Sequence, residues 1–228
     1  MIDHLNGRRW LLLLAGLLAL YLPNQEVWAQ QYGQPLPTVN KDQLAVGVAL
    51  ANFNRKIRIS GFQLSSDNTR ETVFVDWGYQ ENAMFRGEFS TVDLGSSRGS
   101  EFAFSYRRSF GEPTEVGDGD MTIKKGFLAG IRKGEVSDQG IEADFLQIDL
   151  AAGGVIDIDE NKFVYFAAIF SKLDGTITVA GTDFDFEGDS SLGIYGGGTF
   201  KLDKSLLIGA EMHFLFGSGF GLFGRLTF

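Results

Sequence analysis

The chain has 228 residues, of which 44% are hydrophobic and 21% are charged, so it is neither a disordered polymer nor a bundle of membrane helices. Its 21 Phe and 30 Gly against 4 Pro favour strands over helices. A net charge of −9 excludes the basic surface that nucleic-acid binding requires. The chain contains no cysteine, which excludes disulfides, thiolate zinc sites and cysteine nucleophiles.

The N-terminus has the pattern of a secretory signal. Residues 8–22 begin with two arginines and continue as an apolar run that is short for a membrane span. Pro23 ends this run, and Ala29 is a small residue suited to signal peptidase cleavage before Gln30. We therefore predict residues 1–29 to be a signal peptide that directs the chain across the inner membrane, with a single membrane anchor as the alternative.

The rest of the chain has the pattern of strands. Residues 30–42 contain two prolines and are expected to form an extended periplasmic leader. From residue 43 onward the hydrophobic period is two, and no stretch sustains a helical stripe. Strands are expected at residues 44–53, 72–80, 83–94, 100–110, 121–134, 141–157, 162–173, 190–202, 206–216 and 220–228.

Ten strands of this length predict the fold. A tilted transmembrane strand needs about 9–11 residues, and an even number of strands is typical of bacterial outer-membrane barrels. Over residues 43–228 we expect an all-β, transmembrane, up-and-down antiparallel β-barrel, with eight strands as the alternative count. Short joins after the second, sixth and eighth strands and long polar joins after the first and seventh agree with short periplasmic turns and longer external loops.

The last two strands show the clearest alternation. In residues 206–216 the even positions are apolar, and Glu211 and His213 lie on the opposite face. Residues 220–228 repeat the pattern, with Arg225 on the face opposite the apolar one. These charge-free apolar faces favour lipid contact over a soluble barrel of lipocalin type. A turn at residues 217–219 would set Phe216 opposite Phe220 and predicts an internal ion pair between Glu211 and Arg225.

The C-terminus resembles a known signal. The chain ends in Gly224-Arg225-Leu226-Thr227-Phe228, which is similar to the C-terminal signal of Gram-negative outer-membrane β-barrels of the small OmpA-like or porin-like class. Phe223 stands where that signal usually has a glycine. The resemblance implies residence in the cell outer membrane, contact with its lipid, and recognition of Leu226 and Phe228 by the barrel assembly machinery.

Charged residues on the expected inner faces nearly cancel in sign. They are expected to form a lumen network with His213, and they are Asp76, Arg86, Glu88, Glu101, Arg107, Lys124, Arg132, Asp149, Lys201, Glu211 and Arg225. A selective pore more often has an excess of one sign at its constriction, whereas a narrow interior must pair its charges. We therefore expect a non-enzymatic barrel with an envelope-structural or surface-interaction role. A small porin or passive channel is the first alternative.

Two patterns suggest other chemistry. Glu211 beside His213 could serve a barrel enzyme that acts on lipid or peptide, which is the lower alternative. Asp183, Asp185, Glu187 and Asp189 alternate as calcium ligands can, but EF-hand spacing would require a glutamate at Ile194. A solvated acidic hairpin is therefore expected there, with no metal and no cofactor. The sequence indicates no specific surface ligand.

Overall fold

The computed structural model describes residues 33–59, 62–94, 97–116, 121–138, 141–188, 191–214 and 217–228. The predicted signal peptide lies outside these residues. The described strands are β1 (Leu44–Ile59), β2 (Phe62–Gln80), β3 (Ala83–Leu94), β4 (Ser97–Val116), β5 (Met121–Asp138), β6 (Ile141–Asp157), β7 (Lys162–Val179), β8 (Thr182–Gly188), β9 (Leu192–Lys201), β10 (Leu206–Phe214) and β11 (Gly217–Thr227). Within the described ranges, no helix is long and apolar enough to cross a membrane.

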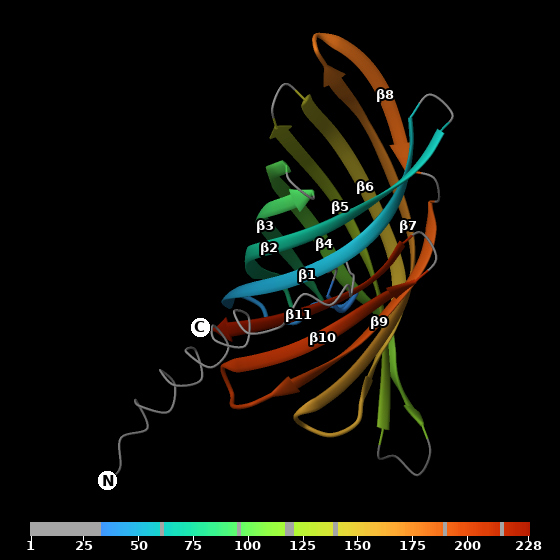
Figure 1. Cartoon of the computed structure of the whole chain (residues 1–228). Coiled ribbons are helices and arrows are strands. Elements are labelled where there is room, and N and C mark those ends of the chain that lie inside the picture. Colours follow the sequence, from blue (N-terminus) through green and yellow to red (C-terminus); the bar gives the residue numbers. More distant parts are fainter. Residues whose placement is uncertain are drawn as a thin grey trace.

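The sheet closes into a barrel (Figure 1). Strands β1 to β7 and then β9 to β11 are neighbours in chain order, and β11 pairs with β1 to complete the circle. The predicted all-β antiparallel barrel of ten strands is confirmed. We call the end at which β1 begins and β11 ends the termini rim, where the Phe228 N–H donates to the Leu44 carbonyl at 2.8 Å. The opposite end is the far rim.

An eleventh strand extends the wall at the far rim. β8 pairs with the second half of β7 and with the last residues of β1. At the far rim, past the ends of β9, β10 and β11, β8 therefore connects β7 to β1. Residues 54–71 and 174–189, expected as long polar loops, are therefore largely strand. The chain turns at Ala180 and Gly181, which both have positive φ, as a two-residue hairpin turn requires. The loop prediction for these segments relied on their many charged residues. It was wrong because a strand that is surrounded by water does not need an apolar outer face.

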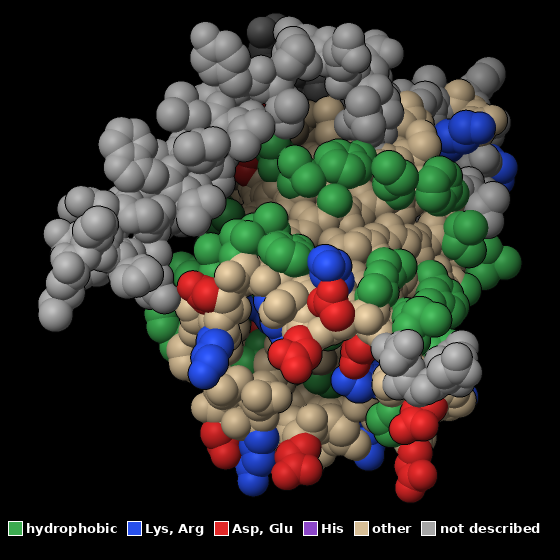
Figure 2. Space-filling view, turned by 90° about the horizontal axis from the view of Figure 1, so that it is seen from below, with side chains coloured by type: hydrophobic (Ala, Val, Ile, Leu, Met, Phe, Trp, Pro, Cys, Tyr) green, Lys and Arg blue, Asp and Glu red, His purple; other side chains and the backbone are tan. Residues whose placement is uncertain are grey.

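Outward-facing side chains define an apolar belt around the barrel. In β7, Val164, Phe166 and Phe170 point outward, and the next outward residue is Lys172. The same change from apolar to polar occurs at Leu50/Asn52, Val73/Glu71, Phe89/Thr91, Phe102/Ser100, Ile131/Lys133 and Leu146/Asp144. In Figure 2, hydrophobic side chains gather mainly in the upper part and along the right side of the view, and most of the charged ones lie below them. A ring of exposed apolar residues around a polar interior is the arrangement that a lipid bilayer stabilises.

Glycines on the inner face accommodate aromatic rings from the neighbouring strand. A Cβ atom on Gly209 would lie 2.4 Å from the ring of Phe223, which is its cross-strand partner. The pairs of this kind are Gly47 with Phe74, Gly134 with Phe145, Gly175 with Phe186, Gly197 with Tyr165 and Gly209 with Phe223. Each ring lies over the glycine, in the space that a larger side chain at that position would occupy. This contact fixes the register of the two strands.

The register of the last two strands differs from the predicted one. Glu211 lies opposite Gly221, and Met212 lies opposite Phe220. The predicted alignment of Phe216 with Phe220 is therefore wrong, because Phe220 pairs with a residue four positions earlier on β10, although the assignment of even positions to the outer face is kept. The cause is that Gly217 and the residues after it do not form the turn but continue β11, where they pair with the far end of β1.

Candidate functional site

The N-terminal segment enters the lumen at the termini rim. Leu36 is buried in a cluster that includes Leu128 and Tyr165. Val39 packs against Ala45 and Met84 in a second cluster. The segment was expected as a leader outside the barrel, but the structure places its residues 33–39 inside, where they bury apolar side chains that a leader in water would expose.

Polar contacts hold the same segment along its length. Arg107 Nη1 donates to the carbonyl oxygen of Gln34 at 3.2 Å, and Arg225 donates both to the hydroxyl of Thr38 and, at 2.9 Å, to its carbonyl oxygen. The carbonyl oxygen of Asn40 passes so close to Gly78 that a Cβ atom there would lie 1.8 Å from it. We call residues 33–39 the plug, because they fill this end of the lumen and are fastened to its wall.

The largest ionic cluster lies deeper in the lumen. Glu101 accepts from Arg70 Nη2 at 2.6 Å and from Arg132 Nη1 at 2.9 Å. Arg132 Nη2 also reaches Glu88 at 2.9 Å, and Arg86 lies 3.8 Å from the other oxygen of Glu88. Every side chain in this cluster is at most 9% exposed. At such burial each charge must be compensated by a partner.

A second cluster joins the wall to the plug. Asp76 accepts a bidentate pair from Arg86, with distances of 2.6 and 2.9 Å. Arg225 lies 3.4 Å from the same carboxylate while it donates to Thr38. The predicted ion pair between Arg225 and Glu211 is therefore wrong, because the shifted register sets Leu207 opposite Arg225.

Glu211 instead belongs to a third cluster. It accepts from the hydroxyl of Tyr165 at 2.7 Å, and its other oxygen lies 2.6 Å from Nε2 of His213. The ring of Tyr195 stacks on His213 with centroids 5.2 Å apart. Glu211 is 1% exposed and His213 is 3% exposed, so neither side chain meets a surface that a substrate can reach.

The structure brings most of the predicted network together. Asp76, Arg86, Glu88, Glu101, Arg107, Arg132, Asp149, Glu211, His213 and Arg225 lie in the lumen. Lys124 and Lys201 do not, because they are exposed where their strands approach the termini rim. Lys124 pairs with Asp157 there at 2.7 Å, and Lys201 lies over the ring of Phe163.

Arg70, a central member of the ionic cluster, was not predicted. It falls in a segment that was taken for a loop, where its position on the inner face could not be recognised. The alternation through Arg70, Thr72 and Phe74, all on one face of β2, is the signal that would have found it. With Arg70 in place of the two lysines, the network has equal numbers of acidic and basic residues.

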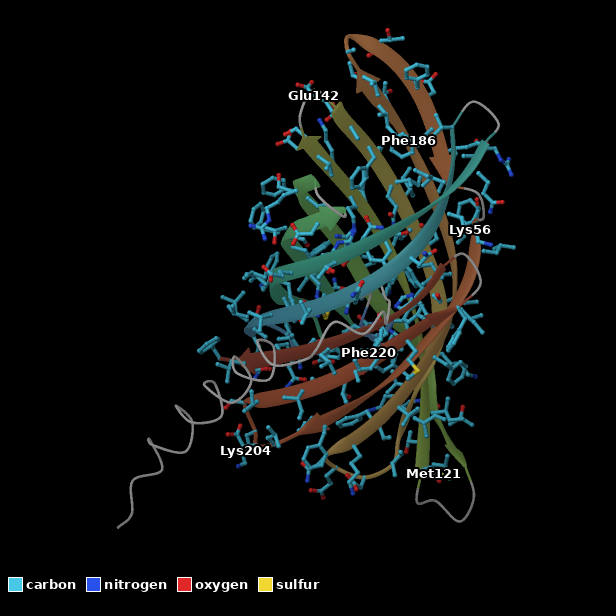
Figure 3. The ribbon with its side chains drawn as sticks, in the orientation of Figure 1. Lys56, Met121, Glu142, Phe186, Lys204 and Phe220 are labelled. Atoms are coloured by element: carbon cyan, nitrogen blue, oxygen red, sulfur yellow. The ribbon has the colours of Figure 1, made fainter. Side chains whose placement is uncertain are left out.

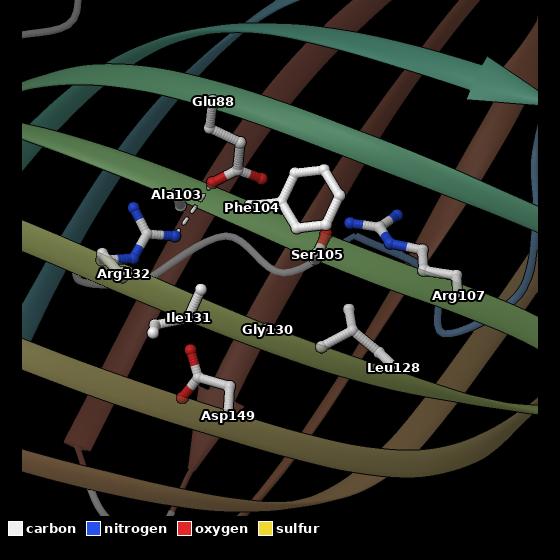
Figure 4. Close-up of a pocket in the computed structure, with 10 residues that line it drawn as sticks. All are labelled: Glu88, Ala103, Phe104, Ser105, Arg107, Leu128, Gly130, Ile131, Arg132 and Asp149. Atoms are coloured by element: carbon white, nitrogen blue, oxygen red, sulfur yellow. Dashed lines mark hydrogen bonds and ion pairs between the residues drawn. The ribbon is translucent and has the colours of Figure 1, made fainter.

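A small cavity lies between these side chains. Figure 4 shows a cavity beside Arg107 and Arg132, lined also by Leu128 and Asp149. Its volume of about 20 Å³ is room for about one water molecule. The described part of the chain holds no group of three or more His, Cys, Asp or Glu side chains that could bind a metal ion. Asp183, Asp185 and Glu187 lie exposed on β8.

No protein-family model matches the chain, and no curated protein matches it. Among solved structures, it is similar to Ail, the attachment invasion locus protein of Yersinia pestis, with 14% identity, a TM-score of 0.40, and coverage of 82% of this chain and 99% of that one. It is also similar to the translocator domain of the autotransporter NalP from Neisseria meningitidis, with 12% identity, a TM-score of 0.39, and coverage of 97% and 93%. For the outer membrane protein Omp33 of Acinetobacter baumannii the values are 8%, 0.37, 82% and 99%. Likenesses at this level do not indicate a ligand or a partner.

Proposed function

We propose that this protein is a sealed, non-enzymatic β-barrel of the outer membrane that serves the envelope as a structural element and presents its far-rim wall for surface interaction. The observation that carries the proposal is the packing of the lumen. The plug packs against the wall at one end, and paired, buried arginine and carboxylate side chains lie in the middle.

The lumen supports a sealed barrel over a porin. A conducting pore needs a continuous water-filled path, and its selectivity usually comes from an excess of one charge sign. Here the charges are balanced, and each of the three clusters joins inward-facing side chains of different strands. Guanidinium groups held between carboxylates cannot move aside without leaving buried charges unpaired.

The geometry of Glu211 and His213 supports a structural role for this pair. A general base must come within hydrogen-bond reach of the proton that it removes from a substrate. The Nε2 atom of His213 is already in contact with Glu211, and the Tyr195 ring covers one face of the imidazole. Their burial supports a structural role over contact with a lipid or a peptide.

The surface role is supported by the far-rim wall. Beyond the belt, β5, β6, β7 and β8 continue as paired strands whose outward side chains are mostly charged or hydroxyl-bearing. Figure 3 shows this wall rising on the side that carries Glu142 and Phe186, away from the termini rim near Lys204. With the termini rim in the periplasm, the wall would face the cell exterior.

Single-channel recording on the full-length protein refolded into planar bilayers tests the sealed lumen. We expect no stable open level at moderate voltage. A reproducible stepwise conductance would contradict the proposal and favour the porin. The inserted state is verified in the same preparation by its heat-modifiable gel shift, since a closed barrel with paired backbone groups resists detergent.

Membrane fractionation tests the location. We expect the protein in the outer-membrane fraction, with an N-terminus near Gln30. Deletion of Phe228 is expected to lower the inserted fraction, because the terminal aromatic is proposed to be read by the assembly machinery. Truncated protein that inserts as well as the parent would refute that role.

A further inference from the structure

Two cations point outward from the barrel near the termini rim. They are Arg108 on β4 and Lys125 on β5, and both side chains are exposed. Arg107, which precedes the first, and Gly126, which follows the second, are buried on the inner face. Strand alternation therefore turns Arg108 and Lys125 toward the surrounding membrane and away from the lumen network.

The two cations are neighbours on the outer surface. Arg108 lies opposite Phe127, and Lys125 lies opposite Phe110. The cations are therefore diagonal neighbours on adjacent antiparallel strands, with a separation of about 7–8 Å at the backbone. Both side chains are long and flexible, so their charged ends can reach the same group.

Aromatic rings show the level at which the cations lie. Tyr106 is the outward residue next to Arg108 on β4, and its ring lies 5.9 Å from that of Phe127. The ring of Phe110, beside Lys125, is half exposed. Girdles of aromatic residues on transmembrane barrels lie where acyl chains give way to headgroups. Arg108 and Lys125 therefore lie at the headgroup level of the leaflet on the termini-rim side.

These two cations differ from other lysines at the same rim in having no carboxylate partner. Lys162 lies 2.8 Å from Asp159, and Lys124 lies 2.7 Å from Asp157. Among the residues that the structure describes, no carboxylate forms an ion pair with Arg108 or Lys125. An anion from outside the chain would therefore meet two positive charges that no acidic side chain of the described barrel neutralises.

We propose that Arg108 and Lys125 together bind the phosphate of an anionic phospholipid. On the orientation proposed above, this lipid belongs to the leaflet next to the periplasm. Lys125 lies opposite Gly154 on its other side, and the missing side chain leaves room for the headgroup. The acyl chains run over Phe127 and Ile131 toward the middle of the belt. This inference rests on the membrane placement in the proposed function but does not depend on whether the lumen is sealed.

The charges of the site favour a lipid with a net negative charge. A zwitterionic headgroup would bring an ammonium group to a place where two cations repel it and no paired carboxylate attracts it. A free phosphate ion would meet the same cations but would gain nothing from the rings and the apolar belt beside them. The combination of two cations with an apolar surface complements an anionic lipid.

Native mass spectrometry of the full-length protein, released from vesicles of equal parts phosphatidylglycerol and phosphatidylethanolamine, tests the proposal. Each Lys or Arg beside an anionic headgroup is expected to favour it about fivefold. We therefore expect retained phosphatidylglycerol, preferred at least about tenfold over phosphatidylethanolamine. Equal retention of the two lipids would overturn the proposal. Loss of the retained lipid when inorganic phosphate is added to the vesicles would also overturn it, because the site would then bind the phosphate group alone.

Variants locate the site. Arg108→Gln and, separately, Lys125→Gln are each expected to lower the preference about fivefold. Lys162→Gln is the matched control, because it removes the same charge at the same rim from a lysine that already pairs with Asp159. A preference that survives both site variants, or falls equally in the control, would overturn the assignment. The gel shift of each variant verifies insertion, so loss of the lipid is distinguished from loss of the barrel.

Discussion

Replacing Glu101 by glutamine removes one charge from the centre of the lumen while keeping the shape of the side chain. Glu101 is 1% exposed and accepts from Arg70 at 2.6 Å and from Arg132 at 2.9 Å. Hydrogen bonds to charged groups contribute about 1.5–3 kcal/mol each, and removing one partner of a buried ion pair costs about 3–5 kcal/mol. Arg132 keeps its contact with Glu88, so the lower half of this range, about 3–4 kcal/mol, is expected for Glu101→Gln.

Urea unfolding in lipid vesicles measures this loss, with the fluorescence of Trp77 on the belt as the probe. Glu71→Gln on the same sheet is the control, because that carboxylate is exposed and should cost less than about 0.5 kcal/mol. Combining Glu101→Gln with Arg70→Met should cost clearly less than the sum of the single changes, because no unpaired guanidinium then remains at position 70. A loss below about 1 kcal/mol for Glu101→Gln, or strict additivity, would refute the view that the cluster is a dry, mutually dependent unit.

Three further changes test separate parts of the structure. Leu36→Ala should release the plug, since it removes a buried side chain worth about 2–5 kcal/mol; proteolysis of the N-terminal segment should then accelerate at least tenfold, and an unchanged rate would contradict docking inside the lumen. Cysteines at Met212 and Phe220 should cross-link on oxidation, whereas Met212 with Gly224 should not, and the reverse result would restore the predicted register. Gly209→Val should abolish insertion, because the added side chain meets an aromatic ring; normal insertion would show that this contact is dispensable.

The belt was predictable because lipid imposes one simple requirement on every strand that crosses it. Strands β3 and β6 have the predicted bounds, and the even positions of β10 face outward as expected. In these strands apolar residues recur at every second position for the full thickness of the membrane. Alternation of this length has few other interpretations.

The far-rim wall and the register could not be predicted in the same way. Beyond Phe170 the outward positions of β7 become polar, beginning at Lys172. The period of two continues to Val179, but the apolar outward face that marks a lipid-facing strand is absent, so the charged and polar residues were given the greater weight. Alternation determines which face of the sheet a residue is on. A register shift by an even number of residues keeps every residue on the same face, so alternation does not determine the register. The position of the turn determines the register of β10 with β11. The glycines that suggested a turn at residues 217–219 are part of β11 and pair with β1 instead.

The plug was missed for another reason. Its short segment has no periodicity, and its two prolines are equally typical of a leader in solution. What holds it inside is the set of contacts with the barrel wall, such as those of Arg107 and Arg225, from residues far away in the chain. A single sequence does not reveal such pairings.

The accessibility of one cysteine in the lumen tests the sealed interior most directly. Ser90 is fully buried on the inner face and bonds to Thr72 at 2.8 Å, and the chain has no cysteine of its own. In vesicles, Ser90→Cys should stay unmodified by a small charged methanethiosulfonate reagent added from either side, while Asn82→Cys in an exposed turn reacts fully. Modification of the Ser90→Cys thiol at a rate near that of the Asn82→Cys thiol would mean a water-filled lumen and would contradict the account.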